Sequence, residues 1–304
     1  MVGDDRVKQT GAYLRMLLRR SGEYRAEWQR FSGPVAPEEI DYAAVARVLT
    51  QADGPPSEPL DPLAPIEVTR QALEGTALGA DTLTRFVTAF RVRPRHAERL
   101  TGLLRGSANL RVINDDVRLP AVLGRAVDAT AYESLSLHER HTLGPDGRPA
   151  EHQTIQVLRS RIDDLTSLPY RFDTDELVVE VVRGGSVGEV YRLSETLHAV
   201  DILLDEPLHR GHSTLMQYRT NFFYRTAPPP EFRRGVLSST KDLTIWVTFH
   251  PDRLPRRVWL ARWDALDHAR ITEEEPVELD DEGSVHCRFT DVERTIVGFH
   301  WEWA

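Results

Sequence analysis

The first third of the chain places hydrophobic residues every three or four positions, which is the spacing of an amphipathic helix. In "GAYLRMLLRRSG", for example, Tyr13, Leu14, Leu17 and Leu18 share one helical face. The same spacing returns four times before residue 107 and predicts four further helices, over residues 40–49, 66–73, 82–90 and 94–106.

Glycine, proline and aspartate positions predict where these helices begin and end. Gly75 occupies the place of a left-handed C-cap, and Asp81 is a suitable N-cap for the helix that follows. Five prolines in "DGPPSEPLDPLAP" (53–65) predict an irregular loop before residue 66. The pattern therefore indicates a small helical bundle with a proline-rich insertion.

From Tyr132 onward the hydrophobic period changes to two, which is typical of half-buried strands. The turn sequences "GPDGRP" and "GGSVG" each separate two alternating runs and predict two hairpins. About ten strands without intervening helices predict antiparallel pairing. We therefore expect an α+β protein of two domains, the second an antiparallel β-sandwich, with a jelly roll or a barrel as alternatives.

The charge distribution supports a division near residue 125. Residues 1–125 hold 18 Lys/Arg and 16 Asp/Glu, a net of +2; the remaining 20 and 31 give residues 126–304 a net of −11. The total of −9 disfavours a chain that coats nucleic acid along its whole length. The predicted domains are thus residues 1–125 and 126–304.

Other features of the sequence bear on its compartment. There is no apolar run long enough for a membrane span, so no membrane partner is expected, and the charged N-terminus is unlike a secretory signal. Cys287 is the single cysteine, so neither an intramolecular disulfide nor a multi-cysteine zinc site can form. We expect a cytoplasmic protein without a cofactor.

Two segments resemble parts of a Cro/repressor-like helix-turn-helix domain of the XRE class. "GAYLRMLLRRSG" is similar to the first helix of that family, and "EVTRQALEGTALGADTLTRFVTAFRV" to its recognition helix, the next loop and the next packing helix. The matched positions are Leu73, Gly75, Leu83, Phe86, Val87 and Ala89. The whole layout resembles actinobacterial regulators that join a degenerate repressor-like head to an uncharacterised β domain. The resemblance implies a transcriptional regulator that binds DNA through its helical domain as a homodimer, with the β domain sensing a signal or oligomerising.

The resemblance also indicates candidate DNA contacts. Thr69, Arg70 and Gln71 lie on the presumed recognition helix, where side chains meet base edges or phosphates. Further phosphate contacts are expected from other arginines of the helical part, namely Arg19, Arg20, Arg91, Arg93 and Arg95.

Two features of the first domain depart from the family pattern. A short turn normally joins the two helices of the motif, whereas here the first is expected to end within residues 28–33, about thirty residues before Ile66. Glu67 and Glu74 also flank Arg70, and carboxylates repel phosphates. Two alternatives thus stay open: a plain solvated helix face, or a protein-interaction or scaffold module that uses both domains and docks a partner through the β domain.

The candidate catalytic and ligand-binding motifs are few. "GGSVG" matches a nucleophile elbow with Ser186 as nucleophile, but a strand-like run follows where a helix is required, so we expect no enzyme. His138 and His141, three apart on a strand, are expected on opposite faces as solvated residues near a hairpin end. His209 and His212 lack an evident third metal ligand. The tryptophans of the second half are expected in the core, with a small-molecule pocket as the alternative.

Overall fold

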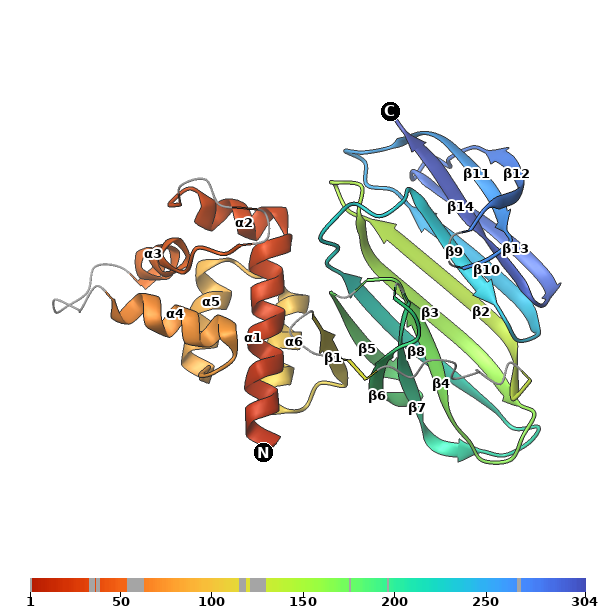
Figure 1. Cartoon of the computed structure of the whole chain (residues 1–304), viewed down its shortest axis with the longest axis horizontal. Helices are drawn as coiled ribbons and strands as arrows, with labels where there is room; N and C mark the ends of the chain where they lie inside the picture. Colours follow the sequence, from red (N-terminus) through yellow and green to blue (C-terminus); the bar gives the residue numbers. More distant parts are fainter. Residues whose placement is uncertain are drawn as a thin grey trace. The chain divides into compact units, whose positions relative to one another are not determined.

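The computed structural model describes residues 2–32, 36, 39–53, 63–114, 119–120, 130–174, 176–195, 197–266 and 269–304. The chain divides into two compact units, Met1–Ala108 with the helices and Asn109–Ala304 with the strands (Figure 1). The mixed α+β composition is therefore as expected. The boundary predicted near residue 125 is wrong, because the strand Leu110–Ile113 already pairs inside the second unit.

The described part of the helical unit is built around a helix of nineteen residues, α1. Its apolar stripe is buried, and Trp28 of the next helix donates from Nε1 to the Leu18 carbonyl at 2.9 Å. The helices are α1 (Val2–Arg20), α2 (Gly22–Gln29), α3 (Tyr42–Asp53), α4 (Ala64–Glu74), α5 (Ala80–Ala89) and α6 (Pro94–Arg105).

The ends of α4 and α5 match the sequence pattern in part. Gly75 caps α4 with φ of +69°, as expected for a left-handed cap. The N-cap of α5 is Gly79, so the assignment of Asp81 as N-cap is wrong; Asp81 lies in the first turn, where its charge favours the helix dipole.

The helix that comes directly before α4 in the chain, α3, is also one of its packing partners. These two helices pack against each other, and α3 also contacts α5. The segment between them is residues 54–63, so most of the predicted proline-rich loop lies outside the described residues. The expectation that a helix ending near residues 28–33 partners α4 is therefore wrong, because α3 intervenes.

Two glycines let α1 approach the C-terminal end of α4 at backbone distance. A Cβ atom added to Gly11 would lie 2.5 Å from the Ala72 carbonyl oxygen, and one added to Gly75 would lie 2.6 Å from the Lys8 Cα. Both distances are shorter than any normal contact. The crossing of α1 and α4 thus depends on glycine at both positions.

The described part of the β unit forms three sheets. A seven-stranded sheet has the order β1-β5-β8-β3-β2-β10-β13, and two smaller sheets have the orders β12-β11-β14-β9 and β4-β7-β6. The strands are β1 (Leu110–Ile113), β2 (Tyr132–Leu143), β3 (Pro149–Ser160), β4 (Leu165–Phe172), β5 (Leu177–Arg183), β6 (Gly185–Arg192), β7 (His198–Leu208), β8 (Ser213–Phe222), β9 (Glu231–Val236), β10 (Thr240–Thr248), β11 (Pro255–Trp263), β12 (Ile271–Val277), β13 (Ser284–Val292) and β14 (Thr295–Trp303).

Strand pairing follows the sequence in one hairpin and departs from it in two places. The β2–β3 hairpin around "GPDGRP" is confirmed. The second expected hairpin is wrong, because the chain changes sheet at Gly184: β5 pairs with β8 and β6 pairs with β7. The expectation of wholly antiparallel pairing is also wrong, because β10 lies parallel to β2.

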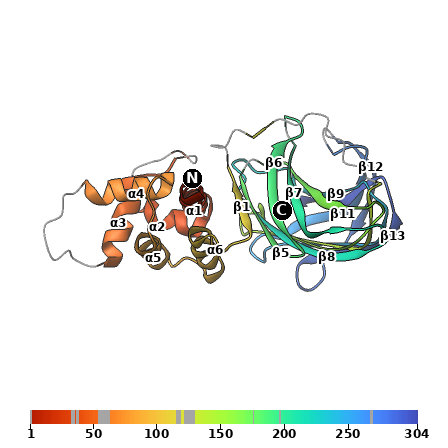
Figure 2. The ribbon, with the colours of Figure 1, turned by 90° about the horizontal axis from the view of Figure 1, so that it is seen from below.

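Both smaller sheets pack against one face of the seven-stranded sheet. One apolar cluster joins Leu158 and Tyr218 of the large sheet to Val200 of β7, and a second joins Leu137 of the large sheet to Phe299 of β14. Cross-strand pairing places all three large-sheet residues on the same face. Figure 2 shows β6, β7, β9 and β11 above the layer that contains β5 and β8. The face of the large sheet that the smaller sheets cover, its inner face, therefore contributes residues to both apolar clusters.

Candidate functional site

The three residues predicted to read bases lie on α4 in different environments. Thr69 is fully buried, and its Oγ1 donates to the Pro65 carbonyl at 2.8 Å. Its assignment as a DNA contact is therefore wrong, because a partner cannot reach its side chain. Arg70 and Gln71 are half-exposed.

Arg70 is held between two glutamates. Its Nε and Nη2 donate to Glu67 at 3.0 and 2.7 Å, and its Nη1 donates to Glu74 at 2.6 Å. Gln71 Nε2 also donates to Glu67, at 2.7 Å. The hydrogen bond from Arg70, then that from Gln71, lowers the pKa of Glu67, which keeps this carboxylate charged. This face of α4 thus carries two carboxylates for one guanidinium, and phosphates would be repelled rather than attracted.

The other predicted phosphate contacts lie on other elements. Arg93 is exposed, pairs with Glu23 at 2.5 Å, and donates from its backbone N–H to the Tyr24 hydroxyl at 3.0 Å. Arg19 and Arg20 lie in the last turn of α1. Arg91 and Arg95 lie two positions to either side of Arg93, at the junction of α5 and α6.

Ser186 does not have the surroundings of a nucleophile elbow. It lies on β6, exposed, and its pairing partner on β7 is Leu203. The chain continues as a strand after Ser186, so the strand-to-helix turn that the motif requires is not formed there.

The histidine pairs also differ from the sequence expectation in part. His138 and His141 do face opposite sides of β2, but His141 is only 4% exposed, so its expected solvation is wrong. His209 and His212 lie in the turn after β7 with ring centroids 6.1 Å apart. Among the described residues, no group of three or more His, Cys, Asp or Glu side chains could hold a metal ion.

The central strands of the large sheet carry a band of buried polar residues on their inner face. In the register of β2 and β3, Glu139 lies opposite Thr154, and His141 lies opposite His152. Directly opposite residues share a face. All four are at most 4% exposed, and we call them the polar band.

Glu139 is the centre of the hydrogen bonding in the polar band. Its Oε2 lies 2.6 Å from both His152 Nε2 and Thr154 Oγ1, and its Oε1 lies 3.0 Å from Arg234 Nη1. Burial raises the pKa of Glu139, but the charges of Arg234 and His152 and the hydrogen bonds from His152 and Thr154 outweigh it, so the pKa is lowered. Because a carboxylate only accepts, His152 Nε2 carries the hydrogen of their contact.

Three ring nitrogens of the polar band remain without hydrogen bonds. Burial, reinforced by the charge of His152, lowers the pKa of His141 well below its usual value, so its ring is neutral at pH 7. Within the described residues, both ring nitrogens of His141 and Nδ1 of His152 have no hydrogen-bond partner. An unpaired buried polar group costs about 1–3 kcal/mol. A ligand that formed hydrogen bonds to these nitrogens would remove this cost, and its binding would be favoured accordingly.

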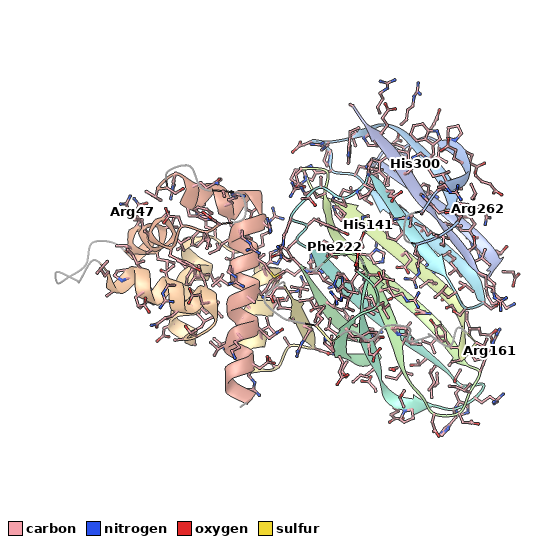
Figure 3. All side chains as sticks on the ribbon, viewed as in Figure 1. Arg47, His141, Arg161, Phe222, Arg262 and His300 are labelled. Carbon is pink, nitrogen blue, oxygen red and sulfur yellow. The ribbon has the colours of Figure 1, made fainter. Side chains whose placement is uncertain are left out.

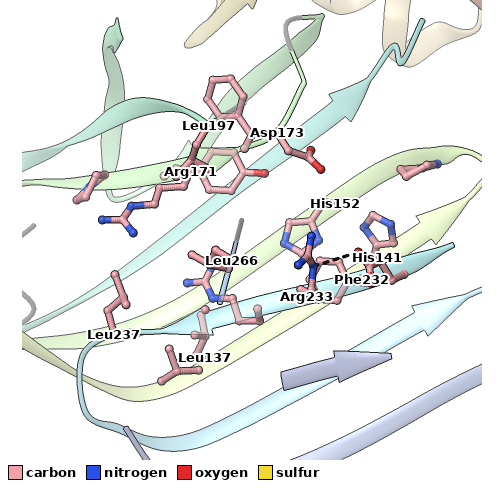
Figure 4. A pocket seen from close by; sticks show the side chains of 18 of the residues that line it. Leu137, His141, His152, Arg171, Asp173, Leu197, Phe232, Arg233, Leu237 and Leu266 are labelled. Atoms are coloured by element: carbon pink, nitrogen blue, oxygen red, sulfur yellow. Dashed lines mark ion pairs between the residues drawn. The ribbon is translucent and has the colours of Figure 1, made fainter. Parts of the chain in front are cut away.

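A pocket of about 240 Å³ opens onto the polar band. This is slightly below the common range for small-molecule sites, about 300–1,000 Å³. Phe232 of β9 stacks on His141 and His152 with ring centroids 4.7 and 5.1 Å away, and Phe222 lies 6.0 Å from His141. Figure 3 labels His141 and Phe222, and Figure 4 shows the pocket from close by. Other lining residues come from β2, β4, the segments around β9 and the segment after β11, and include Tyr132, Tyr170, Arg171, Phe172, Tyr224, Arg233, Leu237 and Leu266.

The alternation of β2 is a sequence signal for this site, although no catalytic or metal-binding motif marks it. Leu137 and Leu143 are buried on β2, and Glu139 and His141 have the same parity, so simple alternation places them inside. The tryptophans suggested as alternative pocket walls are not among the described lining residues, whose aromatic members are Phe, Tyr and His.

Comparison with known proteins gives no family for this chain. No family model matches, and no curated protein is similar. Among solved structures, a "putative protease" from Parabacteroides distasonis aligns at TM-score 0.37 and 12% identity over 56% of this chain. A two-domain M1 zinc metallopeptidase, an E323A mutant bound to L-tryptophan, aligns at TM-score 0.27 and 13% identity over 55%. The chain spans 40% and 43% of their lengths, and neither likeness carries an argument about activity.

Proposed function

We propose that the β unit binds a small organic molecule in the pocket above the polar band. The observation that carries this proposal is the set of three unpartnered imidazole nitrogens beside a cavity with aromatic walls. Binding sites for small molecules combine apolar walls with a few convergent polar groups. The stacking of the smaller sheets on the large one supports a β-sandwich as the scaffold.

The test uses NMR of the full chain with its histidine ring nitrogens labelled, titrated with a library of organic fragments. Fragments that bind the pocket should shift the His141 ring signals, because they satisfy its nitrogens. His209, exposed in the turn after β7, is the matched control and should not shift. The proposal fails if no fragment shifts the His141 signals. It also fails if every fragment that binds has the same affinity for the His141→Phe variant as for the unchanged chain.

A second function, DNA binding through the helical unit, is favoured by one observation. The pair α3 and α4, followed by α5, has the order of elements that the XRE resemblance implies, and α3 packs on α4. We therefore retain the proposal of a cytoplasmic, dimeric transcriptional regulator whose β unit senses a ligand. The opposing observation is the pairing of Arg70 with Glu67 and Glu74.

DNA selection from a random library at low salt tests this second function. If α4 reads DNA, Arg70→Glu abolishes selection, and Glu67→Gln with Glu74→Gln strengthens it by releasing Arg70 and removing two repulsive charges. Absence of any selected sequence, or binding that ignores all three substitutions, would instead favour a protein-interaction module.

A further inference from the structure

The charge of Arg171 is an unusual feature of the pocket wall. This residue lies on β4 opposite Ala199 of β7, is half-buried, and lines the pocket. Within the part of the chain that the structure describes, the Arg171 side chain makes no hydrogen bond and no ion pair. A half-buried guanidinium without an acceptor has lost part of its hydration and gained no hydrogen bond in return, so an anion that reaches it would be bound favourably.

The groups around Arg171 do not replace that acceptor. Burial is the first cause that lowers its pKa; Tyr132 and Tyr191 oppose this effect, and the charge of Arg234 adds to it. None of these groups is a carboxylate. The one charged group among them is Arg234, which is also positive.

The acidic residues near the pocket are already engaged. Glu231 pairs with Arg233 at 3.1 Å, Glu139 with Arg234 at 3.0 Å, and Asp173 accepts from the Tyr224 hydroxyl at 2.7 Å. Arg171 is thus the one described arginine lining the pocket that lacks a counter-ion, and an anion from solution would supply it.

We propose that the pocket takes a small organic carboxylate, with its anion on Arg171, its polar group on the imidazoles of His141 and His152, and its apolar body against Phe232. Figure 4 draws Arg171 at one side of the pocket and the two imidazoles at the other, so the two polar anchors receive different parts of one molecule. The inference rests on the proposed ligand-binding function and names the chemical class of the ligand.

A carboxylate suits this site better than a phosphate. The guanidinium fork matches two carboxylate oxygens in a bidentate contact. A phosphate would bring more than one negative charge to a pocket that has one arginine without a counter-ion and already contains the Asp173 carboxylate. The aromatic walls also require an organic body, which inorganic phosphate lacks.

The test measures affinities of the full chain for matched pairs of fragment-sized carboxylic acids and their primary amides, with inorganic phosphate as a third probe. The acid of a binding pair should bind about tenfold tighter or more than its amide, since only the acid forms charge-assisted hydrogen bonds. Arg171→Gln should abolish this preference and leave amide binding unchanged. Arg171→Lys should retain part of it, because it keeps the charge and loses the fork.

The outcomes separate the two proposals. Equal binding of acids and amides, or an acid preference that survives Arg171→Gln, overturns the carboxylate assignment and leaves the ligand-binding function intact. Tighter binding of phosphate than of any acid also overturns it. Failure of every pair to bind overturns both. The Arg171→Gln variant should fold, because the substitution removes no partner from another residue. Without ligand, the melting temperature of this variant should be higher than that of the unchanged chain. A lower melting temperature would contradict the unpaired state of Arg171.

Discussion

At the scale of single residues, the inner face of the large sheet carries a buried ion pair, that of Glu139 with Arg234. Glu139 is fully buried and has three partners, of which Arg234 carries the compensating charge. Removal of one member of a buried ion pair leaves the other uncompensated, which is worse than removal of both. Glu139 therefore stabilises the unit only as long as its partners remain.

Replacement of Glu139 by Gln should lower the free energy of unfolding by about 3 kcal/mol, because Arg234 then keeps a largely buried charge without a counter-ion. Urea denaturation of the β unit measures the loss. The double variant Glu139→Gln/Arg234→Met should recover part of it. Equal or larger destabilisation in the double variant would contradict the ion-pair explanation.

His96 gives the helical unit a pH dependence. Burial, followed by the charges of Arg99, Arg95 and Arg93, lowers its pKa to about 4, and its Nδ1 lies 2.7 Å from the Tyr13 hydroxyl. The unfolded histidine titrates near its ordinary pKa of about 6.5. Between these two pH values the unfolded chain binds a proton that the folded chain does not. Stability should therefore fall as the pH is lowered through this window.

The expected loss between pH 6.5 and about 4 is up to about 3 kcal/mol. Urea unfolding monitored by helical circular dichroism at a series of pH values measures it. His96→Gln should flatten the dependence over this window. An unchanged slope in the variant would assign the effect to other groups.

At the scale of elements, local sequence patterns predict the helices and the first hairpin. They do not predict which strands pair when the strands are far apart in the chain. Gly75 and the apolar positions of α4 and α5 depend on residues within a few positions, so the sequence reveals them. The parallel contact of β10 with β2 joins strands about a hundred residues apart, and nothing within either strand specifies it. Arg234 reaches Glu139 from such a distant strand, which is why the site could be predicted only in part.

The crossing of α1 with α4 offers a test at this scale. Gly75→Ala should destabilise the helical unit by more than about 1 kcal/mol, because it adds a Cβ against the Lys8 backbone at a residue with φ of +69°. Gly22→Ala is the matched control, since its added Cβ meets nothing within 4 Å. Thermal unfolding compares the two. A control that loses as much stability as Gly75→Ala would contradict the backbone contact.

At the scale of the whole molecule, the chain consists of two units whose boundary is set by β1. The short strand Leu110–Ile113 is buried along β5, and Asn109 adds a hydrogen bond from its side chain to the Gly185 carbonyl at 2.7 Å. Charge balance alone assigns this segment to the helical domain. In the described part of the chain, no helix is both long and apolar enough to cross a membrane.

Chains of residues 109–304 and 126–304 should therefore differ in stability. The first keeps β1 and should unfold cooperatively, whereas the second exposes the β5 edge and the side chains that β1 covers. Urea unfolding and size-exclusion chromatography compare them. Equal stability of the two chains would contradict the role of β1 in the β unit.

The parallel pairing of β2 with β10 has a consequence for the order in which the protein is made. β2 leaves the ribosome long before β10, so its edge stays open while β3 to β9 are synthesised. During that interval Glu139 also lacks Arg234, which belongs to β9. A charge that points inward from an open edge discourages pairing with foreign strands. We therefore expect Glu139, which later joins the members of the polar band, to protect the unfinished sheet while the chain is still being translated.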